Sequence, residues 1–421
     1  MSVAVVLGTA ACDDSPDRCP DGYCYDGSDP CPDGDCEVIS LAAGGGFLNA
    51  GGSCVLTSLG EVWCWGVIAD ERQERAVRRV PDLPEEGRLL MGTGFVVRPP
   101  LCVVTEGAVG AGASVACRFV DPVGGEVRQG PLPEVPGDGL RDFALGGGHA
   151  CYVRQDGAVG CVWLDDAVAL GVVEDPPEII EPDDWSAQVG AAATAIVAGL
   201  DHACALTQSG AVYCWGLGDV GQLGVAPPDQ CERGDGDAPC ANVPQQVTDG
   251  VSELWAGGTL TCARRLEGGI DCWGYVGEGR FDDPYLAALG GSVAPDEGRI
   301  WTEPTALPAP GPVRGLAIGK EHLCMLLEDQ TVRCFGSNRA GQLGDGSFDA
   351  ADAPGVNPGL ERVVALAAGR LHTCAATEDA AVLCWGDDET SQLGSVASEQ
   401  CTSVEGFSYP CEPEPSRVNG F

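Results

Sequence analysis

Short apolar runs recur along the whole chain, and turns rich in Gly, Pro, Asp and Asn separate them. Within many of these runs hydrophobic and polar side chains alternate, which is the two-residue period of a β-strand and not the period of a helix. Few stretches have the pattern of an amphipathic helix. The pattern therefore predicts an all-β protein that is built from many short strands.

The clearest unit of this pattern lies between Cys204 and Cys214. Gly210 supplies a turn beside the midpoint, so folding the chain there makes a hairpin with the two cysteines directly opposite each other. Because side chains alternate between faces, Leu206 shares the face of the cysteines and Trp215 takes the other face. Facing residues of an antiparallel pair lie about 4.5–5.5 Å apart, which is within reach of a disulfide. The cross-link is expected to contribute about 2–3 kcal/mol to stability.

Six cysteine pairs have nine residues between their members, a seventh has fourteen, and the pairs return about every 50 residues along the chain. A β-rich period of about 50 residues is typical of a β-propeller, with one four-stranded sheet, or blade, per repeat. The predicted pairs are Cys54 with Cys64, Cys102 with Cys117, Cys151 with Cys161, Cys204 with Cys214, Cys262 with Cys272, Cys324 with Cys334 and Cys374 with Cys384. The sequence thus predicts a seven-bladed β-propeller with a disulfide-stapled hairpin in most blades. A short Cys/Asp/Pro-rich linker precedes it.

Three stretches carry the repeat in full, namely residues 196–224, 316–344 and 366–394. Each runs Gly-x-x-His-x-Cys, then a polar turn, then Val-x-Cys-Trp-Gly or Val-x-Cys-Phe-Gly, and ends in Gln-Leu-Gly. This combined motif resembles the repeat of the regulator of chromosome condensation family, and it is most similar to the cysteine-rich bacterial members. The resemblance covers roughly residues 38–421. It implies a seven-bladed propeller, in agreement with the repeat count, and guanine-nucleotide exchange on a small GTPase, the activity of the founding relative.

Charge narrows the choice of partners. The chain has 23 Lys plus Arg against 63 Asp plus Glu, which gives a net charge of −40 at pH 7. Such a surface repels phosphate backbones, so nucleic-acid binding is not expected, whereas cations or basic partners would be attracted. A solvated acidic surface without any partner would show the same charge.

Cysteine content indicates the compartment. Twenty-three cysteines are too many for a reducing cytosol unless they bind metal. Metal sites usually combine close Cys-x-x-Cys pairs with a second pair or with histidines, and the dominant spacing here is different. The sequence therefore predicts disulfides, an extracytoplasmic location in a bacterial envelope or medium, and no metal or other cofactor.

The histidines and the Trp residues of the Cys-Trp-Gly motif occupy repeat positions. The histidines are His149, His202, His322 and His372, and the Trp residues are Trp65, Trp215, Trp273 and Trp385. A catalytic or metal-binding residue is usually unique in its setting, so copies in several blades indicate structural roles. For the histidines such a role is a bond to a nearby backbone carbonyl, and for the Trp residues it is packing between blades. No nucleophile elbow, phosphate-binding loop or zinc-protease helix is present, and no enzyme is predicted. An envelope enzyme without a visible site remains an alternative.

Two loops carry an additional cysteine pair each, Cys231 with Cys240 and Cys401 with Cys411. In both loops a Gln precedes the first cysteine and a Pro precedes the second. These patterns predict disulfide-closed surface loops. Loops on one face of a propeller commonly form the binding surface, and a purely structural staple is the alternative.

The amino terminus reads as a targeting segment followed by a linker. Residues 1–11 are apolar and small, and Cys12 follows them as in a lipoprotein signal, although no basic residues start the segment. Residues 12–37 are rich in Asp, Pro and Gly, with predicted small loops Cys19–Cys24 and Cys31–Cys36. Eleven pairs leave only Cys12 unpaired, which fits lipidation of that residue. An ordinary secretion signal that removes Cys12 is the alternative.

The propeller is expected to span residues 38–421 and to be closed by its carboxy-terminal strand. Residues 415–421 contain the Pro-x-x-Val pattern that opens other blades, so this strand is predicted to complete the sheet of the first blade. The functional prediction is an exported, lipid-anchored binding scaffold that recognises a protein or glycan through propeller loops. Nucleotide exchange on a small GTPase is the alternative that the family resemblance implies.

Overall fold

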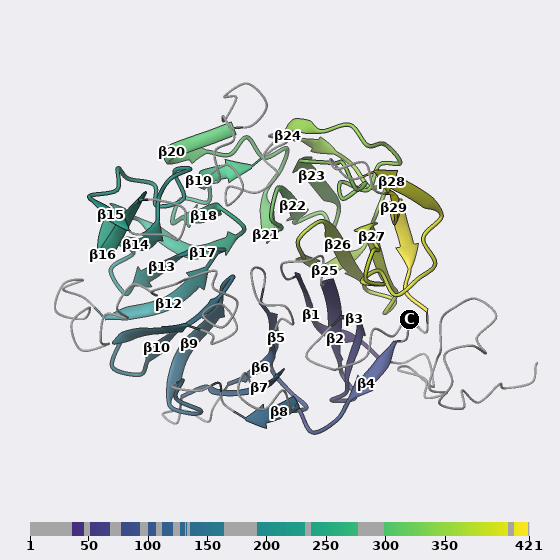
Figure 1. The fold of residues 1–421 in the computed structure, drawn as a ribbon, viewed down its shortest axis with the longest axis horizontal. Helices are drawn as coiled ribbons and strands as arrows, with labels where there is room; N and C mark the ends of the chain where they lie inside the picture. Colours follow the sequence, from purple (N-terminus) through teal and green to yellow (C-terminus); the bar gives the residue numbers. More distant parts are fainter. Residues whose placement is uncertain are drawn as a thin grey trace, which may run out of the picture.

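The computed structural model describes residues 36–45, 51–67, 77–92, 100–106, 112–120, 127–130, 132, 135–163, 192–231, 237–276, 299–402, 408–419 and 421. These residues form strands and turns, and the strands assemble into seven antiparallel sheets arranged as a ring (Figure 1). The predicted all-β, seven-bladed propeller is confirmed. Within the described residues no helix is long and apolar enough to cross a membrane.

The blades follow one another along the chain. Blade 1 contains β1 (Val38–Gly45), β2 (Gly51–Thr57), β3 (Val62–Gly66) and β4 (Arg78–Val80), and blade 2 contains β5 (Arg88–Met91), β6 (Leu101–Thr105), β7 (Ser114–Val120) and β8 (Val127–Gly130). Blade 3 contains β9 (Leu140–Leu145), β10 (His149–Arg154) and β11 (Val159–Trp163). Blade 4 contains β12 (Ala193–Ala198), β13 (His202–Thr207), β14 (Val212–Leu217), β15 (Asp229–Cys231) and β16 (Ala238–Thr248).

The remaining blades have the same order. Blade 5 contains β17 (Val251–Gly257), β18 (Leu260–Arg265), β19 (Ile270–Val276) and β20 (Arg299–Ala306), and blade 6 contains β21 (Val313–Ile318), β22 (His322–Leu327), β23 (Val332–Gly336) and β24 (Ala351–Val356). Blade 7 contains β25 (Val363–Ala368), β26 (His372–Thr377), β27 (Val382–Asp387), β28 (Glu399–Thr402) and β29 (Ser408–Arg417). The first strand of each blade lies nearest the centre of the ring (Figure 1).

The stapled hairpin is the second and third strand of a blade. In blade 4, Cys204 is the direct cross-strand partner of Cys214, and their sulfurs are 2.11 Å apart. Leu206 packs with these cysteines against blade 5, whereas Trp215 faces blade 3. The predicted alternation of faces is therefore confirmed, and each hairpin contributes to the cores on both of its sides.

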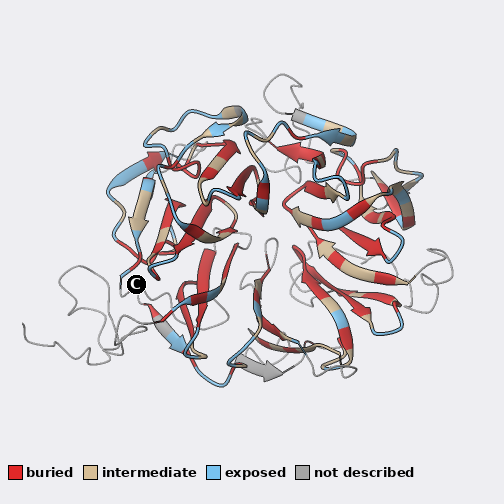
Figure 2. Cartoon of the chain, turned by 180° about the vertical axis from the view of Figure 1, so that it is seen from behind, coloured by how far each residue is buried: buried red, intermediate tan, exposed pale blue. Residues whose placement is uncertain are grey.

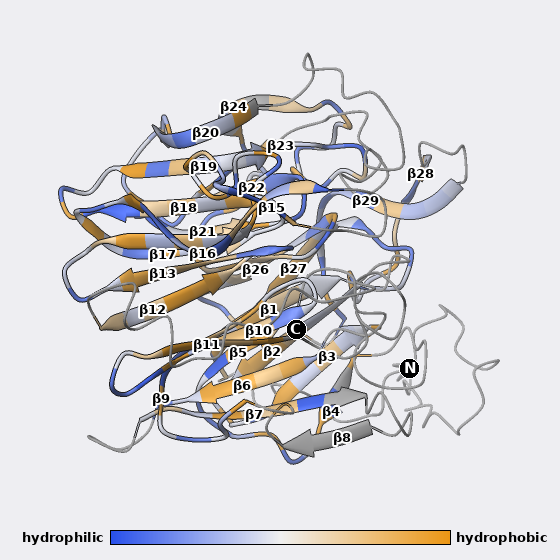
Figure 3. Ribbon diagram, turned by 60° about the vertical axis from the view of Figure 1, so that its left-hand side comes forward, coloured by the Kyte–Doolittle hydropathy of each residue, from blue (hydrophilic) through white to orange (hydrophobic). Residues whose placement is uncertain are grey.

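The hydrophobic core is divided among the interfaces between blades. Seven clusters of buried side chains each combine residues of two neighbouring blades, and an eighth lies under the loop of blade 7. Buried residues follow the strands in every blade (Figure 2), and the more polar residues concentrate in the connecting turns (Figure 3). The ring is thus held by blade-to-blade packing, as expected for a repeat protein.

Seven glycines, one at the inner end of each blade, allow the blades to approach one another. In ring order they are Gly44, Gly92, Gly146, Gly199, Gly258, Gly319 and Gly369. A Cβ atom added to any of them would lie 2.6–3.5 Å from the carbonyl oxygen of the next glycine, and the seventh faces the first. Most of these approaches leave no room for a side chain, which explains why the apolar run before each hairpin ends in Gly.

The carboxy-terminal strand does not complete the first blade. Leu383 of β27 pairs with Arg417 of β29, so the last strand belongs to blade 7, and blade 1 forms its own four-stranded sheet. The predicted strand exchange is wrong. The remaining residues close the ring by packing, because Phe421 lies against Trp65 of blade 1 with ring centroids 6.2 Å apart. Trp65 and Phe421 share one buried cluster with residues of both blades.

Candidate functional site

Each repeated histidine packs its imidazole directly against the glycine three residues before it. A Cβ atom at Gly319 would overlap the imidazole of His322, and Gly199 and His202 are arranged in the same way. All four histidines are buried. The Gly-x-x-His spacing is therefore a packing device that fixes the imidazole inside the interface with the next blade.

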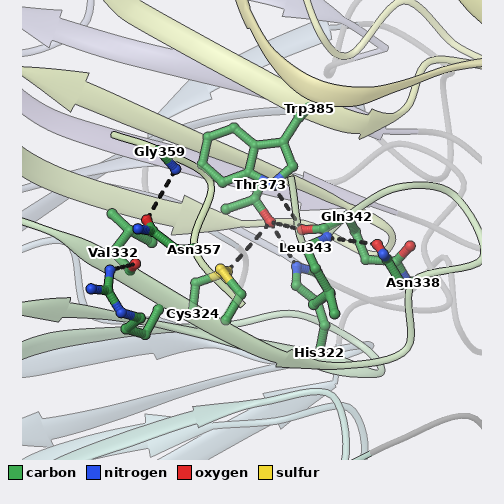
Figure 4. Close-up of a disulfide and its surroundings, with 12 residues drawn as sticks. His322, Cys324, Val332, Asn338, Gln342, Leu343, Asn357, Gly359, Thr373 and Trp385 are labelled. Atoms are coloured by element: carbon green, nitrogen blue, oxygen red, sulfur yellow. Dashed lines mark hydrogen bonds between the residues drawn. A yellow bond between two sulfur atoms is a disulfide. The ribbon is translucent and has the colours of Figure 1, made fainter. Parts of the chain in front are cut away.

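The interface between blades 6 and 7 shows what this imidazole binds (Figure 4). His322 Nε2 lies 2.8 Å from Thr373 Oγ1 of blade 7, and that hydroxyl lies 3.1 Å from the carbonyl oxygen of Gln342. Because the carbonyl can only accept, the threonine donates its proton there and accepts from Nε2–H of the histidine. Trp385 Nε1 donates to the same carbonyl at 2.9 Å. Gln342 belongs to the Gln-Leu-Gly motif, so this motif joins a blade to the next one.

The interface between blades 7 and 1 repeats this network. His372 Nε2 lies 2.9 Å from Ser53 Oγ, which donates to the carbonyl of Gln392 at 3.1 Å. Trp65 Nε1 donates to the same carbonyl at 2.8 Å. The site that closes the ring is therefore built from residues more than 300 positions apart in the sequence.

The interface between blades 4 and 5 has the histidine and the threonine without the tryptophan bond. His202 Nε2 lies 2.7 Å from Thr261 Oγ1, which reaches the Gln222 carbonyl at 3.4 Å. Trp273 fills the same place as Trp385, but its buried Nε1 has no hydrogen-bond partner. At the interface between blades 3 and 4 the residue that would receive His149 is Ala203.

Burial lowers the pKa of every one of these histidines. The pKa falls to about 3 for His202 and His322 and to about 4 for His149 and His372. Desolvation of the charged imidazolium is the main cause. These side chains are neutral at pH 7, and their geometry describes structural latches between blades.

Two disulfide-closed hairpins project from the same end of the propeller. They connect the third strand to the outer strand, and we give the name arm 4 to residues 229–231 and 237–240 of blade 4 and the name arm 7 to residues 399–402 and 408–411 of blade 7. Their registers match: the acidic residue faces the second cysteine, the Gln faces the Pro, and the first cysteine faces the residue before the Pro. The disulfides Cys231–Cys240 and Cys401–Cys411 have sulfurs 1.98 and 2.05 Å apart. The two arms are therefore one structural module used twice.

An equivalent backbone hydrogen bond holds each arm in place. In arm 4 the Pro239 carbonyl accepts a hydrogen bond from Gly218 N at 2.9 Å, and in arm 7 the Pro410 carbonyl accepts one from Asp388 N at 3.0 Å. Both donors lie in the loop that leaves the third strand. This bond holds each arm on its own blade, while Gln230 and Gln400 stay exposed on the arms.

Arm 7 also packs against the neighbouring blade 6. Tyr409 and the Cys401–Cys411 disulfide are buried together with Ala340 of blade 6 and Leu371 of blade 7. Beneath the arm, burial raises the pKa of Asp387 to about 6, although Gln392 Nε2 donates to its carboxylate at 2.8 Å. Burial likewise raises the pKa of Tyr409 to about 12. Arm 7 is thus a fixed part of the surface that spans the interface between blades 6 and 7.

The structure places the other predicted site residues as follows. It joins all seven hairpin pairs, with sulfurs 1.98 to 2.11 Å apart. Cys36 is also disulfide-bonded, but its predicted partner Cys31 lies outside the described residues. The same holds for Cys12, Cys19 and Cys24, and hence for the signal-like segment and most of the linker. In the described part of the chain, no three His, Cys, Asp or Glu side chains are grouped to hold a metal ion.

Sequence reasoning missed the hydroxyl partners of the histidines. Ser53, Thr261 and Thr373 each come directly before the first cysteine of a blade, and the preceding blade carries a His at its own Gly-x-x-His position. Where blade 5 has Leu260 at that position, blade 6 has Leu323 before its cysteine. This matching between consecutive repeats is visible in the sequence once the ring order of the blades is known.

Comparison with known proteins agrees with the fold and the repeat. The family described as Regulator of chromosome condensation (RCC1) repeat matches residues 193–222, 313–342 and 363–392, and a second description of the same repeat matches 209–263 and 331–376. The chain is a propeller of stapled repeats. Its residues 193–263 and 313–392 carry regulator of chromosome condensation (RCC1) repeats.

Curated relatives share the repeat over part of their length. The chain is 31% identical over 228 residues to the mitochondrial RCC1 domain-containing protein RUG3 of Arabidopsis thaliana, covering 51% of this chain and 46% of that protein. It is 26% identical over 202 residues to the secretion-regulating guanine nucleotide exchange factor of Bos taurus, covering 43% of this chain and 39% of that protein. The chain thus spans less than half the length of these relatives.

A solved structure with the same fold is Prp20p of Saccharomyces cerevisiae, whose binding to Gsp1p and histones has been described. The TM-score is 0.55 at 16% sequence identity, with 82% of this chain and 84% of that chain covered. At this identity the likeness concerns the fold.

Proposed function

We propose that the protein is an exported binding scaffold that recognises a protein or glycan with the propeller face that carries the two arms. The observation that supports this proposal is the repetition of one disulfide-closed module on blades 4 and 7, held by equivalent backbone bonds to the Pro239 and Pro410 carbonyls. A rigid pair of projecting loops on one face is a typical binding surface of a repeat protein. Among the relatives are binding and exchange proteins, which agrees with a role in recognition.

The chemistry of this face favours a polar or basic partner. Both arms expose a Gln that is flanked by an acidic residue, Asp229 in arm 4 and Glu399 in arm 7. The whole chain carries a net charge of −40, so a basic partner would be attracted over long range and would bind more weakly at high salt. A glycan would instead be insensitive to salt and would be displaced by soluble sugar.

Binding is tested with the purified propeller immobilised against an envelope extract. The variants are Gln230→Ala and Gln400→Ala on the arms, and the matched control is Gln208→Ala, an exposed glutamine in the hairpin turn at the opposite end of blade 4. We expect the arm variants to lose the captured partner and the control to retain it. Equal capture by all three variants would contradict the proposed surface.

Export is a separate part of the proposal, and the cysteine content supports it. Nine disulfides join eighteen of the cysteines within the described residues, a density typical of oxidising compartments. Alkylation of the protein in intact cells, followed by peptide mapping without reductant, should recover these pairs oxidised. A pool with free thiols throughout would place the chain in the cytosol.

Lipid anchoring at Cys12 rests on the sequence alone. The expected mature protein begins at Cys12 with a diacyl group and partitions into the detergent phase. Mass spectrometry of the amino terminus tests this. A mature protein that begins beyond residue 12, or that stays in the aqueous phase, would contradict the lipid anchor without affecting the assignment of the propeller.

Guanine-nucleotide exchange is the second candidate function, and the exchange-factor relative of Bos taurus supports it. Exchange requires a small GTPase as the partner. Release of a fluorescent GDP analogue from candidate GTPases should accelerate in the presence of the propeller if this function is correct. Unchanged release rates, together with capture of an envelope partner by the arms, would favour the scaffold.

A further inference from the structure

Two of the seven blade interfaces contain a buried histidine that can be protonated only if the packing around it is disrupted. These are His202 between blades 4 and 5 and His322 between blades 6 and 7. In both, Nδ1 is buried and has no hydrogen-bond partner. We propose that these two interfaces are acid-sensitive latches, which hold neighbouring blades together at neutral pH and release them when the histidine becomes protonated. This inference goes beyond the proposed function and does not depend on it.

The hydrogen-bond chain defines the neutral form of the latch. At the interface of blades 6 and 7, Thr373 donates its hydroxyl proton to the Gln342 carbonyl. His322 must therefore carry its own proton on Nε2, so that it can donate to the threonine oxygen. Thr261 and Gln222 set the same tautomer for His202. Protonation would add an N–H at Nδ1, where neither histidine has an acceptor. A buried charge without a partner is strongly destabilising.

The imidazole cannot avoid this cost by turning toward water. It packs closely against Gly319 in blade 6 and against Gly199 in blade 4, and His202 and His322 are each only 1% exposed. Release of the charge to solvent therefore requires the two blades to separate.

Groups facing the two histidines do not offset the charge. The neighbouring strands and loops present a threonine hydroxyl, a glutamine carbonyl and a glycine at each site. The titratable groups that act on them are other histidines, His149 on His202 and His372 on His322, and these oppose protonation further. His149 and His372 differ, because each has a backbone hydrogen bond that favours the charged form.

The direction of the pH effect follows from these shifts. Burial lowers the pKa of both latch histidines from 6.5 to about 3 in the folded protein. Their contribution to stability is therefore complete above pH 6.5 and is lost as the pH falls from 6.5 toward 3. Each latch should raise the unfolding equilibrium constant by about 30-fold between pH 7.5 and pH 5.0.

The latches are placed where their opening would change the arm-bearing face. Arm 4 belongs to a blade that His202 joins to blade 5, and Tyr409 of arm 7 packs on Ala340 across the interface that His322 closes. Opening between blades 6 and 7 would therefore remove part of the support of arm 7. Acid is thus coupled to the geometry of the face that we propose as the binding surface.

The chain provides its own matched control. Between blades 5 and 6 the two latch positions are Leu260 and Leu323, which lie in one apolar cluster. The double variant His322→Leu/Thr373→Leu copies this apolar pair, and the opposite variant Leu260→His/Leu323→Thr places the histidine and the hydroxyl of a latch at an interface that has neither. Acid sensitivity should follow the histidine in both directions.

The experiment compares urea unfolding of the full chain, with disulfides intact, at pH 7.5 and pH 5.0. Relative to wild type, the apolar variant should lose about 30-fold of the pH effect on the unfolding constant, and the opposite variant should gain about 30-fold. If the apolar variant does not fold, the opposite variant alone decides. An unchanged pH effect in the variants that fold would overturn the proposal.

Hydrogen exchange locates the opening. The amides of Lys320 and Leu200 donate across the two latched interfaces at 3.2 and 2.6 Å, and the amide of Gly45 donates across the interface between blades 1 and 2 at 3.3 Å. After correction for intrinsic rates, acid should reduce protection at Lys320 and Leu200 first. Simultaneous loss at Gly45 would indicate global unfolding and contradict local latches.

Discussion

Blade 6 packs against blade 5 through Leu260 and Leu323, and against blade 7 through His322 and Thr373. The residues occupy the same repeat positions, yet one interface is apolar and the other carries a chain of hydrogen bonds. The inner strand and the stapled hairpin of each blade are alike at both interfaces. The difference teaches that close glycine contacts, disulfides and apolar packing are sufficient to hold a blade against its neighbour. The histidine network adds polarity, and with it a dependence on pH.

The largest expected effect concerns the close backbone approach that both interfaces share. A Cβ atom at Gly319 would lie 2.7 Å from the Gly369 oxygen and would overlap His322, and one at Gly257 would overlap the Ile318 carbonyl. Gly319→Ala and Gly257→Ala should each destabilise by about 3 kcal/mol, because the backbone must move. Gly315→Ala is the control, since nothing lies within 4 Å of its added Cβ. Urea unfolding that ranks Gly315→Ala with the other two would refute a shared steric requirement.

The second prediction concerns the hairpin disulfides of blades 5 and 6. Replacing both Cys262 and Cys272 by alanine, or both Cys324 and Cys334, should cost about 2–3 kcal/mol in each case, because both pairs close loops of the same length. Thermal unfolding of the two double variants tests this. A much larger loss in one blade would mean that the interface chemistry, and not the staple, decides how firmly that blade is held.

The third prediction separates the hydrogen bond of the tryptophan from its packing. Trp385→Phe removes the bond from Nε1 to the Gln342 carbonyl, while Trp273→Phe removes an Nε1 that has no hydrogen-bond partner. Trp385→Phe should therefore cost about 1 kcal/mol more than Trp273→Phe. Equal losses of unfolding free energy in the two variants would show that the indole contributes by volume alone.

The smallest effect is expected at Asp387 of blade 7. The residue at the same repeat position of blade 6 is Ser337. Burial raises the pKa of Asp387 from 3.8 to about 6, so its contribution to stability is complete below pH 3.8 and is lost as the pH rises through 6. Asp387→Ser copies the bond that Ser337 accepts from Gln342 Nε2 at 3.2 Å. The variant should be more stable than wild type at pH 7.5, by less than about 1 kcal/mol, with no such gain at pH 4. Loss of stability at pH 7.5 would show that the carboxylate bond to Gln392 outweighs its burial.

The local units of this fold could be predicted from the sequence. Alternation of side chains and the spacing of Cys204 and Cys214 define a hairpin whose register the structure shows, and the repeat of that hairpin gave the number of blades. The two arms were also visible, because each encloses its own cysteine pair within one loop. All of these features depend on residues close together in the chain, where backbone geometry leaves few alternatives.

Only the tertiary structure decided how the repeats are joined. The pairing of His322 with Thr373 and of His372 with Ser53, and the placing of the last strand in blade 7, join residues that lie in different blades. A Pro-x-x-Val strand carries no local sign of which blade it will complete, and β4 already fills that place in blade 1. The physical reason is that the sequence pattern determines which face of a strand is apolar, while ring closure determines which neighbour that face meets.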